Sequence, residues 1–419
     1  MSRWVFLPLL CIPLLAANVA RAQDWNQWRG PRRDGVAVDL TEGEWPQELE
    51  LVWVRKVGGG ISGPVVEGDT VFIHSRRGTR EIVSAFGLAS GELLWSDAYD
   101  ALFDQRYDAR SFGDGPYATP VVADGTLFTY DAHGVLTAYD ARSGKRRWRV
   151  DFWRRLLVRD VEYGVTASPL LVDGKCIVQA GGLRSGGVVA VDATTGETVW
   201  SWEGDRPGYA SPVIATIDGY KQVITQTQVN VVGLDANTGK LLWKIPYRAG
   251  DRNNIVTPVV IEDRVILSGY HMGIEARRIA RGRNGWTATR LWHTREVWSF
   301  LSTPVAMGRW LYGYSDTKRG RLYTLDSRTG ALVWSSRGRM ADHANLIATP
   351  SALLVLAENG TLTVYRRERP VLETVASYTV AEGETWAHPA VSNGYLIVKD
   401  TDNISVWRVG SNEVSVSVP

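Results

Sequence analysis

The sequence contains little cysteine and gives no sign of a disulfide scaffold. Its two cysteines are Cys11, inside the first apolar run, and Cys176, inside the run from Lys175 to Gln179. Removal of the N-terminal run would leave Cys176 alone, which excludes an internal disulfide. We therefore expect Cys176 to be a buried strand residue, and we expect stability to come from a hydrophobic core.

Metal-ligand patterns and catalytic motifs are also absent. The sequence has no nucleophile elbow, phosphate-binding loop, zinc signature or pair of adjacent cysteines. Six histidines are spread along the chain without metal-ligand spacing, and we interpret them as structural: His74, His133, His271, His293, His343 and His388. The sequence thus predicts neither a metal site nor a catalytic set.

An excess of charge of one sign is missing as well. The chain has 47 Lys and Arg residues against 45 Asp and Glu residues. Loss of residues 1–22 would remove Arg3 and Arg21 and no acidic residue, which makes the remaining chain formally neutral. Nothing in this balance attracts nucleic acid or an anionic membrane, so we expect neither as a partner.

Long apolar runs are missing except at the N-terminus. Residues 1–22 carry Arg3, an apolar run from Trp4 to Ala17 and then Ala20-Arg21-Ala22, a pattern typical of a signal peptide cleaved after Ala22. The run is shorter than the ~20 residues that span a bilayer as a helix, although a retained anchor is the alternative. Leu10 before Cys11 does not match a lipobox, so we expect no lipid anchor. We predict an exported protein of the bacterial cell envelope, periplasmic or extracellular, with no transmembrane segment after cleavage.

One repeated hairpin dominates the rest of the chain. It reads AVDATTGETVW from Ala190 to Trp200, where Asp192 can accept hydrogen bonds from turn amides and Gly196 can take a positive φ. The unit recurs as AYDARSGKRRW (Ala138–Trp148), GLDANTGKLLW (Gly233–Trp243), TLDSRTGALVW (Thr324–Trp334) and, weakened, AFGLASGELLW (Ala85–Trp95). Such self-similarity predicts one repeat domain rather than several unrelated ones.

The pattern Ala-x-Asp-x-x-Thr-Gly-x-x-x-Trp resembles the tryptophan docking motif of the pyrroloquinoline-quinone-like propeller repeats. That superfamily includes the quinoprotein alcohol dehydrogenases and BamB, a lipoprotein of the outer-membrane barrel-assembly machinery. The resemblance extends from the leader DWNQWRGPRRDG (Asp24–Gly35) to about Val409. It implies a β-propeller and leaves the activity open.

A second repeated signal sets the number of blades. A small residue or histidine, then proline and an apolar run, occurs eight times, with the prolines 56, 49, 43, 46, 46, 46 and 39 residues apart. Each spacing is close to one four-stranded blade, and each proline suits the start of a strand. The dipeptides are Gly63-Pro64, Thr119-Pro120, Ser168-Pro169, Ser211-Pro212, Thr257-Pro258, Thr303-Pro304, Thr349-Pro350 and His388-Pro389.

Small residues also precede each of these dipeptides, as innermost strands that converge on one axis require. They are Ser62, Ala118, Ala167, Ala210, Val256, Ser302, Ala348 and Ala387. Eight aromatic residues mark the outermost strands, and we interpret them as structural docking residues: Trp53, Trp95, Trp148, Trp200, Trp243, Trp292, Trp334 and, as a substitute, Tyr378.

The fold prediction is therefore all-β, a single eight-bladed propeller of four-stranded antiparallel blades. Trp53 has no blade before it, and the last blade, from His388 to Val409, lacks an outer strand. We predict that Leu49–Arg55 pairs with the strand holding Trp407 and closes the ring; seven blades with a stray strand is the alternative. The predicted segments are a signal peptide (1–22), a leader (23–48), the propeller (49–409) and a tail (410–419). Arg277–Arg290 is interpreted as a solvated basic loop that stretches the fifth hairpin.

The connections that lead into the innermost strands should open together on one face, the mouth of the propeller. Aromatic, arginine and amide side chains recur there, and they suit a protein or small-molecule ligand. The longest connection, Asp97–Tyr117, is expected to fold over the funnel. The alternative is that the rings only fill the funnel. The candidate residues are Arg106, Arg110, Tyr117, Tyr163, Tyr209, Arg252, Asn254, Trp298, Asn345, Trp386 and His388.

Two functions follow from these observations. The first is a monomeric, non-catalytic binding or scaffold module without a cofactor, because no catalytic set is visible. The second, implied by the family resemblance, is an oxidoreductase that holds pyrroloquinoline quinone and Ca²⁺ in the funnel. The dehydrogenases hold the quinone with a vicinal cysteine disulfide and a calcium ion bound by acidic and amide side chains. This sequence has no adjacent cysteine pair and no acidic cluster that matches.

Overall fold

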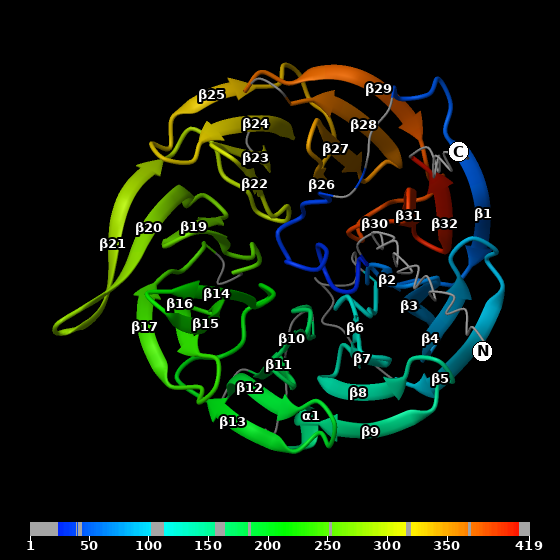
Figure 1. The fold of residues 1–419 in the computed structure, drawn as a ribbon, viewed down its shortest axis with the longest axis horizontal. Coiled ribbons are helices and arrows are strands. Elements are labelled where there is room, and N and C mark those ends of the chain that lie inside the picture. The colour runs from blue at the N-terminus through cyan, green and yellow to red at the C-terminus, as the bar shows by residue number, and fades with distance from the viewer. Residues whose placement is uncertain are drawn as a thin grey trace, which may run out of the picture.

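A computed structural model describes residues 24–38, 40, 44–101, 113–155, 164–182, 186–250, 254–315, 320–367 and 370–409. The strands form eight four-stranded antiparallel sheets around one axis, which confirms the predicted eight-bladed propeller (Figure 1). Helix is confined, within these ranges, to the single turn α1 (Phe152–Arg155).

In the first seven blades the four strands follow one another from the axis outward. Blade 1 contains β2 (Val65–Glu67), β3 (Thr70–Arg77), β4 (Arg80–Gly87) and β5 (Leu93–Asp100). Blade 2 contains β6 (Val121–Ala123), β7 (Thr126–Tyr130), β8 (Val135–Asp140) and β9 (Arg146–Asp151). Blade 3 contains β10 (Leu170–Val172), β11 (Lys175–Gly181), β12 (Gly186–Asp192) and β13 (Thr198–Trp202). Blade 4 contains β14 (Val213–Ile217), β15 (Tyr220–Gln226), β16 (Asn230–Asp235) and β17 (Leu241–Pro246).

The remaining blades complete the circle. Blade 5 contains β18 (Val259–Ile261), β19 (Arg264–Gly269), β20 (Gly273–Gly282) and β21 (Gly285–Thr294). Blade 6 contains β22 (Val305–Met307), β23 (Trp310–Ser315), β24 (Arg321–Asp326) and β25 (Leu332–Ser335). Blade 7 contains β26 (Ala344–Ala348), β27 (Ala352–Ala357), β28 (Thr361–Arg366) and β29 (Glu373–Thr379). Blade 8 contains β30 (Ala390–Ser392), β31 (Tyr395–Lys399), β32 (Asn403–Arg408) and, from the other end of the sequence, β1 (Glu50–Lys56).

The ring closes as predicted. Strand β1 pairs antiparallel with β32, with Trp53 opposite Val406 and Leu51 opposite Trp407. The first strand thereby supplies the outer edge of the last blade (Figure 1). Closure removes the free edge that an incomplete blade would expose to other chains.

The repeated hairpin fixes each blade to the next. The Trp200 indole donates a hydrogen bond to the Ala236 carbonyl of blade 4 at 3.2 Å, and its ring lies against Gly239. Gly239 has φ +70°, and a Cβ there would lie 2.5 Å from the ring, so both conformation and space require glycine. The same contact joins Trp53 to Gly91, Trp95 to Gly144, Trp148 to Gly196 and Trp292 to Gly330. The docking residues therefore make one repeated contact between adjacent blades at these five positions.

The predicted turn chemistry is also present. The Asp192 carboxylate accepts hydrogen bonds from the amides of Thr194 (2.8 Å) and Thr195 (2.9 Å), and Gly196 has φ +75°. Trp243 differs from these five docking residues, since its indole donates to Gln222 of its own blade. In the neighbouring blade 5, strands β20 and β21 stay paired over the residues where the other blades have their docking turn.

The hydrophobic core lies mainly between adjacent blades. Trp200 of blade 3, for example, packs in one cluster with Val223 and Leu234 of blade 4. Cys176 is fully buried in β11, which confirms its predicted role. Most of the small residues that precede the strand-opening prolines are buried too, among them Ala118, Ala210 and Ala387.

Blade 7 contradicts one prediction. Seven prolines stand directly before an innermost strand, but Pro350 follows β26 and lies in the turn to β27. Thr349 holds that turn, because its Oγ1 accepts the Ala352 amide at 2.9 Å. In blade 6, Pro304 lies three residues before Met307, the last paired residue of β22. In blade 7, Asn345 lies three residues before Ala348, the last paired residue of β26, so Asn345 occupies the position equivalent to Pro304. Pro350 is thus a turn residue, since the chain needs a fixed φ there and no amide donor.

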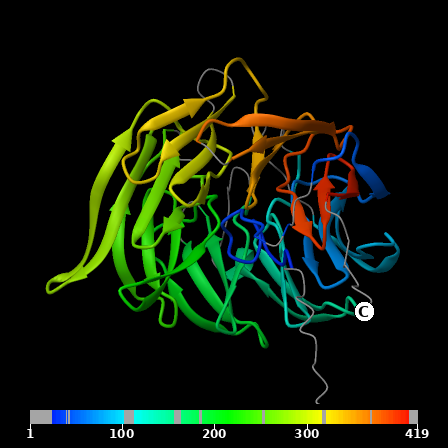
Figure 2. The same ribbon diagram turned by 45° about the horizontal axis from the view of Figure 1, so that its top comes forward.

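Blade 5 departs from the interpretation of a solvated loop. Arg277–Arg290 belongs to the paired strands β20 and β21, whose ladder continues to Gly282 opposite Gly285. The hairpin extends beyond the outline of the ring (Figures 1 and 2). Trp286 contacts the Tyr220 ring of blade 4 edge-on, with the ring centroids 5.6 Å apart. The segment is therefore a paired β-hairpin that also contacts blade 4, and it is not a loop.

The leader lies inside the ring. Residues 24–35 cross the central opening, and Figures 1 and 2 show this blue segment between the inner strands. The Trp25 carbonyl accepts the Val66 amide of blade 1, and the Asn26 carbonyl accepts the Val122 amide of blade 2. On the other side, Val36 forms a parallel bridge with Ala348 of blade 7. The leader therefore fills the centre and joins distant blades.

Candidate functional site

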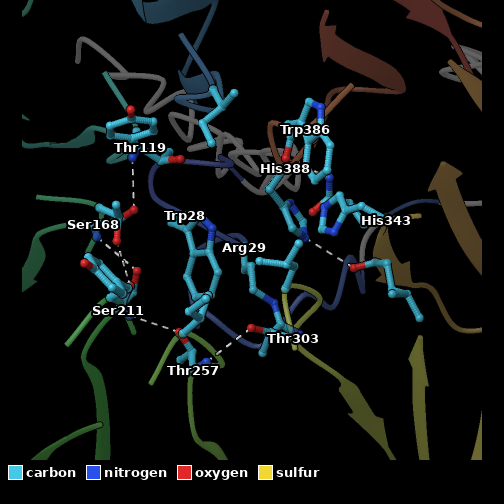
Figure 3. A pocket seen from close by; sticks show the side chains of 18 of the residues that line it. Trp28, Arg29, Thr119, Ser168, Ser211, Thr257, Thr303, His343, Trp386 and His388 are labelled. Atoms are coloured by element: carbon cyan, nitrogen blue, oxygen red, sulfur yellow. Dashed lines mark hydrogen bonds between the residues drawn. The ribbon is translucent and has the colours of Figure 1, made fainter. Parts of the chain in front are cut away.

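A cavity of about 290 Å³ lies at the mouth, above the leader. Its walls come from the connections that enter the inner strands of blades 1 to 8, and its floor is formed by Trp28 and Arg29 of the leader (Figure 3). Tyr117, Tyr209, Phe300 and Trp386 contribute aromatic rings. The lining therefore combines one cation with aromatic, aliphatic and hydroxyl groups.

A belt of hydroxyl groups forms one side of the cavity. At each step, the Ser or Thr oxygen before a strand-opening proline accepts the backbone amide of the equivalent residue in the preceding blade. The lengths are 3.0 Å for Gly63 to Thr119, 3.0 Å for Thr119 to Ser168, 3.0 Å for Ser168 to Ser211, 3.1 Å for Ser211 to Thr257 and 3.3 Å for Thr257 to Thr303. These bonds satisfy amides that proline-containing strands leave without a ladder partner.

The belt hydroxyls still have their own O–H protons available to donate. Within the described residues, the O–H groups of Thr119, Ser168, Ser211, Thr257 and Thr303 have no acceptor, and all five residues line the cavity. A hydroxyl that has accepted one bond still has one proton to donate. The wall is therefore rich in donors and suits a ligand rich in acceptors.

Blades 7 and 8 line the opposite side with different groups. His343 stacks on Trp386, with ring centroids 5.1 Å apart and an interplanar angle of 13°. Its Nδ1 lies 3.1 Å from the Ser302 hydroxyl. The Asn345 amide donates to the carbonyls of Trp386 (3.2 Å) and Ala387 (3.1 Å), which fixes the approach to blade 8.

The two cavity histidines are neutral at pH 7. Burial lowers the pKa of His343 to about 4. Burial, reinforced by the Arg29 charge, lowers the pKa of His388 to about 3. A neutral imidazole whose pKa is far below the working pH is a weak general base. The arrangement therefore favours binding through hydrogen bonds and ring contacts over proton transfer.

The floor is held by the leader's own contacts. The Arg29 guanidinium donates to the Pro304 carbonyl at 2.7 Å, and that of Arg33 donates to the Pro169 carbonyl at 2.7 Å. Both guanidinium groups lie over the Trp28 ring, 5.4 and 5.7 Å from its centroid. Cation–π contacts of this kind offset part of the cost of burying a charge. The floor is thus a built part of the fold.

Five of the predicted mouth residues meet in this cavity: Tyr117, Tyr209, Asn345, Trp386 and His388. Asn254 does not line it, because its buried amide donates to the carbonyls of Thr227 (2.8 Å) and Tyr247 (2.9 Å). Trp298 does not line it either and contacts His271 instead. Arg106, Arg110, Tyr163 and Arg252 lie outside the described residues, as do the predicted signal peptide and tail.

The sequence did not reveal that the leader forms the floor of the cavity or that the hydroxyl belt lines its wall. Trp28 and Arg29 were assigned to a leader outside the propeller, and His343 was interpreted only as structural. The available signals were two tryptophans and three arginines within Asp24–Gly35, and hydroxyl residues before six of the eight prolines. Neither signal reveals which blade a side chain reaches.

The cavity residues do not fit a calcium-bound quinone. Calcium requires oxygen ligands that usually include carboxylates. The described lining has no Asp or Glu, and Arg29 places a positive charge on the floor. Over the described part of the chain, no group of three or more His, Cys, Asp or Glu residues is placed to hold a metal ion. In the same ranges, no helix is long and apolar enough to cross a membrane.

Comparisons with known proteins place the chain beside two kinds of propeller. BamB of Burkholderia pseudomallei is 24% identical over 377 residues, which cover 79% of this chain and 91% of that protein. The 1-butanol dehydrogenase (cytochrome c) of Thauera butanivorans is 26% identical over 365 residues, which cover 84% of this chain but 45% of the dehydrogenase. The chain thus spans less than half of that enzyme.

Solved structures agree on the fold. The crystal structure of BamB from Moraxella catarrhalis superposes with a TM-score of 0.63 at 18% identity, covering 86% of this chain and 99% of that one. A europium-containing methanol dehydrogenase gives 0.68 at 12% identity, covering 92% and 98%. The family model described as outer membrane protein assembly factor BamB matches residues 79–336, more than half of the sequence. The chain belongs to this family of BamB-type propellers.

Proposed function

We propose that this protein is an exported, non-catalytic propeller of the bacterial cell envelope that binds a protein partner at its mouth. Family membership and the predicted signal peptide support the place and the class of function. The observation that carries the proposal is the cavity, where unpaired hydroxyl donors face an aromatic rim and the described lining has no carboxylate.

The cavity chemistry suits one end of an extended peptide. Backbone carbonyls and a terminal carboxylate are acceptors, which the belt hydroxyls and Arg29 can satisfy. The rings of Tyr209, Phe300 and Trp386 can cover an apolar side chain, as aromatic anchors do in protein interfaces. Residues 102–112 of the insertion Asp97–Tyr117 lie outside the described residues; of its two ends, Tyr117 lines the cavity and the Ala101 carbonyl accepts a hydrogen bond from Arg76.

Peptide binding can be measured directly by fluorescence anisotropy. Short fluorescein-labelled random peptides, ending either in a free carboxylate or in a carboxamide, are titrated with the purified mature chain. We expect the carboxylate series to bind more tightly and Trp386→Ala to weaken binding. Trp334→Phe, in the outermost strand β25 and away from the cavity, is the control. Equal binding by the parent and Trp386→Ala would exclude the cavity as the peptide site.

Export has a separate test. Expression of the full chain in a Gram-negative host should yield a periplasmic protein whose N-terminal residue is Gln23, as measured by intact mass. A full-length mass in the membrane fraction would indicate the retained anchor instead.

A quinone-dependent dehydrogenase is the second candidate, favoured by the similarity to the 1-butanol dehydrogenase. The quinone, when bound with its metal, would supply the redox chemistry, and Arg29 would face its carboxylates. The missing carboxylate ligands speak against it. Titration of the mature chain with pyrroloquinoline quinone and Ca²⁺, followed by absorbance, decides between the two, since saturable Ca²⁺-dependent binding would favour the dehydrogenase.

A further inference from the structure

A second cavity, of about 240 Å³, lies farther along the central channel. One side consists of leader residues Arg29, Arg32, Arg33 and Asp34. The other side is apolar and comes from the inner strands β14, β18 and β22 and the turn at Gly308. Arg29 borders both this cavity and the one at the mouth.

Positive charge exceeds negative charge in this lining. Asp34 is the one acidic group of the described lining, and its carboxylate pairs with Arg32 at 2.9 Å and accepts the Val36 amide at 2.9 Å. Arg29 is 2% exposed and Arg33 is 3% exposed. Within the described residues neither has a carboxylate within 4.0 Å, so two buried cations lack a paired anion.

Backbone carbonyls satisfy only part of the two guanidinium groups. Arg29 uses Nη2 for the carbonyls of Asp34 (3.0 Å) and Pro304 (2.7 Å), and its Nη1 bonds no described residue. The Nε atoms of Arg29 and Arg33 are buried without an acceptor. Burying a charged donor without a full set of partners is costly, so the cluster gains from an added anion.

The remaining groups point to the shape of that anion. Arg32 is half-exposed and uses only its Nε, toward Asp34, which leaves both of its Nη atoms available. Three guanidinium groups on one side of a small cavity match an anion with several oxygens, because each of them keeps N–H donors that no described residue accepts. The apolar opposite wall adds no competing acceptor side chain.

We propose that this second cavity is a binding site for a tetrahedral oxyanion of the phosphate or sulfate type, free or as the headgroup of a larger molecule. The anion lies against Arg29, Arg32 and Arg33 and balances the charge inside the channel. The site is separate from peptide binding at the mouth, although Arg29 links the two cavities.

The test uses the purified mature chain and inorganic phosphate at constant ionic strength, with chloride as the exchanged ion. We expect a saturable rise in melting temperature and saturable heat in calorimetry, since a ligand that binds only the folded state stabilises it. Arg32→Gln should weaken phosphate binding about tenfold, the effect of one lost charge-assisted bond. Its melting temperature without phosphate should stay near that of the parent, because exposed ion pairs contribute little.

Arg339→Gln is the matched control, since Arg339 is half-exposed, pairs with Asp342 and does not line the cavity. Arg33→Lys keeps the charge and loses the planar donor, so it should also weaken binding. Vesicles of phosphatidylglycerol, compared with phosphatidylcholine, distinguish a lipid headgroup from a free anion. No saturable phosphate effect, or an equal effect in Arg32→Gln and Arg339→Gln, overturns the proposal.

Discussion

The outer ring and the central channel of this propeller each carry a residue position that recurs from blade to blade, and the two positions differ in what they contact. On the outside, five of the docking tryptophans make one repeated contact with a glycine of the next blade. In the channel, blades 2 to 6 present hydroxyls, whereas blades 7 and 8 present His343, Asn345 and His388. Each repeat holds at five positions, and where the channel repeat ends, blades 7 and 8 place histidine and asparagine side chains at the cavity.

The physical demands on the two regions differ. A docking contact has one solution, because an indole needs a flat surface without a Cβ and a carbonyl acceptor at a fixed place. The channel residues satisfy the inner-strand backbone in more than one way. The belt hydroxyls accept amides, Asn345 donates to the carbonyls of Trp386 and Ala387, and His388 lies within hydrogen-bond distance of the carbonyls of Leu346 and Pro389. Different side chains are therefore possible there, so these positions are available for recognition.

Trp200→Ala should give the largest loss of stability, because it removes a docking contact of the outer ring. Removing a buried indole between two blades leaves a cavity and should cost ~3–5 kcal/mol of unfolding free energy. Chemical denaturation of the variant and parent measures it. Peptide and phosphate binding should be unchanged at temperatures where the variant is folded. A stable variant that had lost binding would move Trp200 from the outer ring to the site.

Acid should destabilise the channel and leave the docking contacts unaffected. The folded-state pKa of His343 is about 4 against 6.5 for the exposed side chain. Between these values the unfolded chain binds the extra proton, so stability falls as the pH falls from about 6.5 to about 4, by on the order of 3 kcal/mol for this one residue. Urea unfolding at several pH values measures the slope. His343→Gln should reduce the slope and leave the part that His388 contributes, whereas Trp200→Ala should leave it parallel to the parent; equal slopes in parent and His343→Gln would show that His343 does not contribute.

Thr257→Val tests whether the hydroxyl belt supports the inner strands. The variant removes the acceptor of the Ser211 amide and should cost ~1–3 kcal/mol, the usual cost of an unsatisfied buried donor. Thr257→Ser retains the hydroxyl and should stay within ~1 kcal/mol of the parent. Thermal unfolding of the pair provides the comparison. If valine and serine were equally stable, the belt would not support the inner strands.

Trp386→Ala should have the smallest effect on stability and the clearest effect on binding. Trp386 is half-buried, stacks on His343 and donates its indole N–H to the exposed Glu384, so its loss should cost about 1 kcal/mol. The melting temperature and the peptide titration are measured on one preparation. A loss comparable with that of Trp200→Ala would show that the aromatic rim is packing rather than a binding surface.

The sequence alone determined the architecture. Blade number, ring closure by the strand around Trp53 and the docking role of Trp200 follow from patterns that repeat along the chain. Such patterns are readable because each hairpin satisfies its own turn, as Asp192 and Gly196 show. The exception is blade 7, where Thr349-Pro350 matches the inner-strand pattern but forms a turn.

The tertiary structure decided the composition of the channel. Arg29 bonds Pro304 across 275 residues of sequence, and Arg33 bonds Ser168 across 135. These contacts occur once, between segments with no common pattern, so no local rule predicts them. Five mouth residues were identified because loops entering inner strands must converge, but Asn254 lies in the same connections and turns its amide into the loop backbone. Which side chain faces the cavity depends on the hydrogen bonds that the surrounding backbone leaves unsatisfied, and only the folded chain defines them.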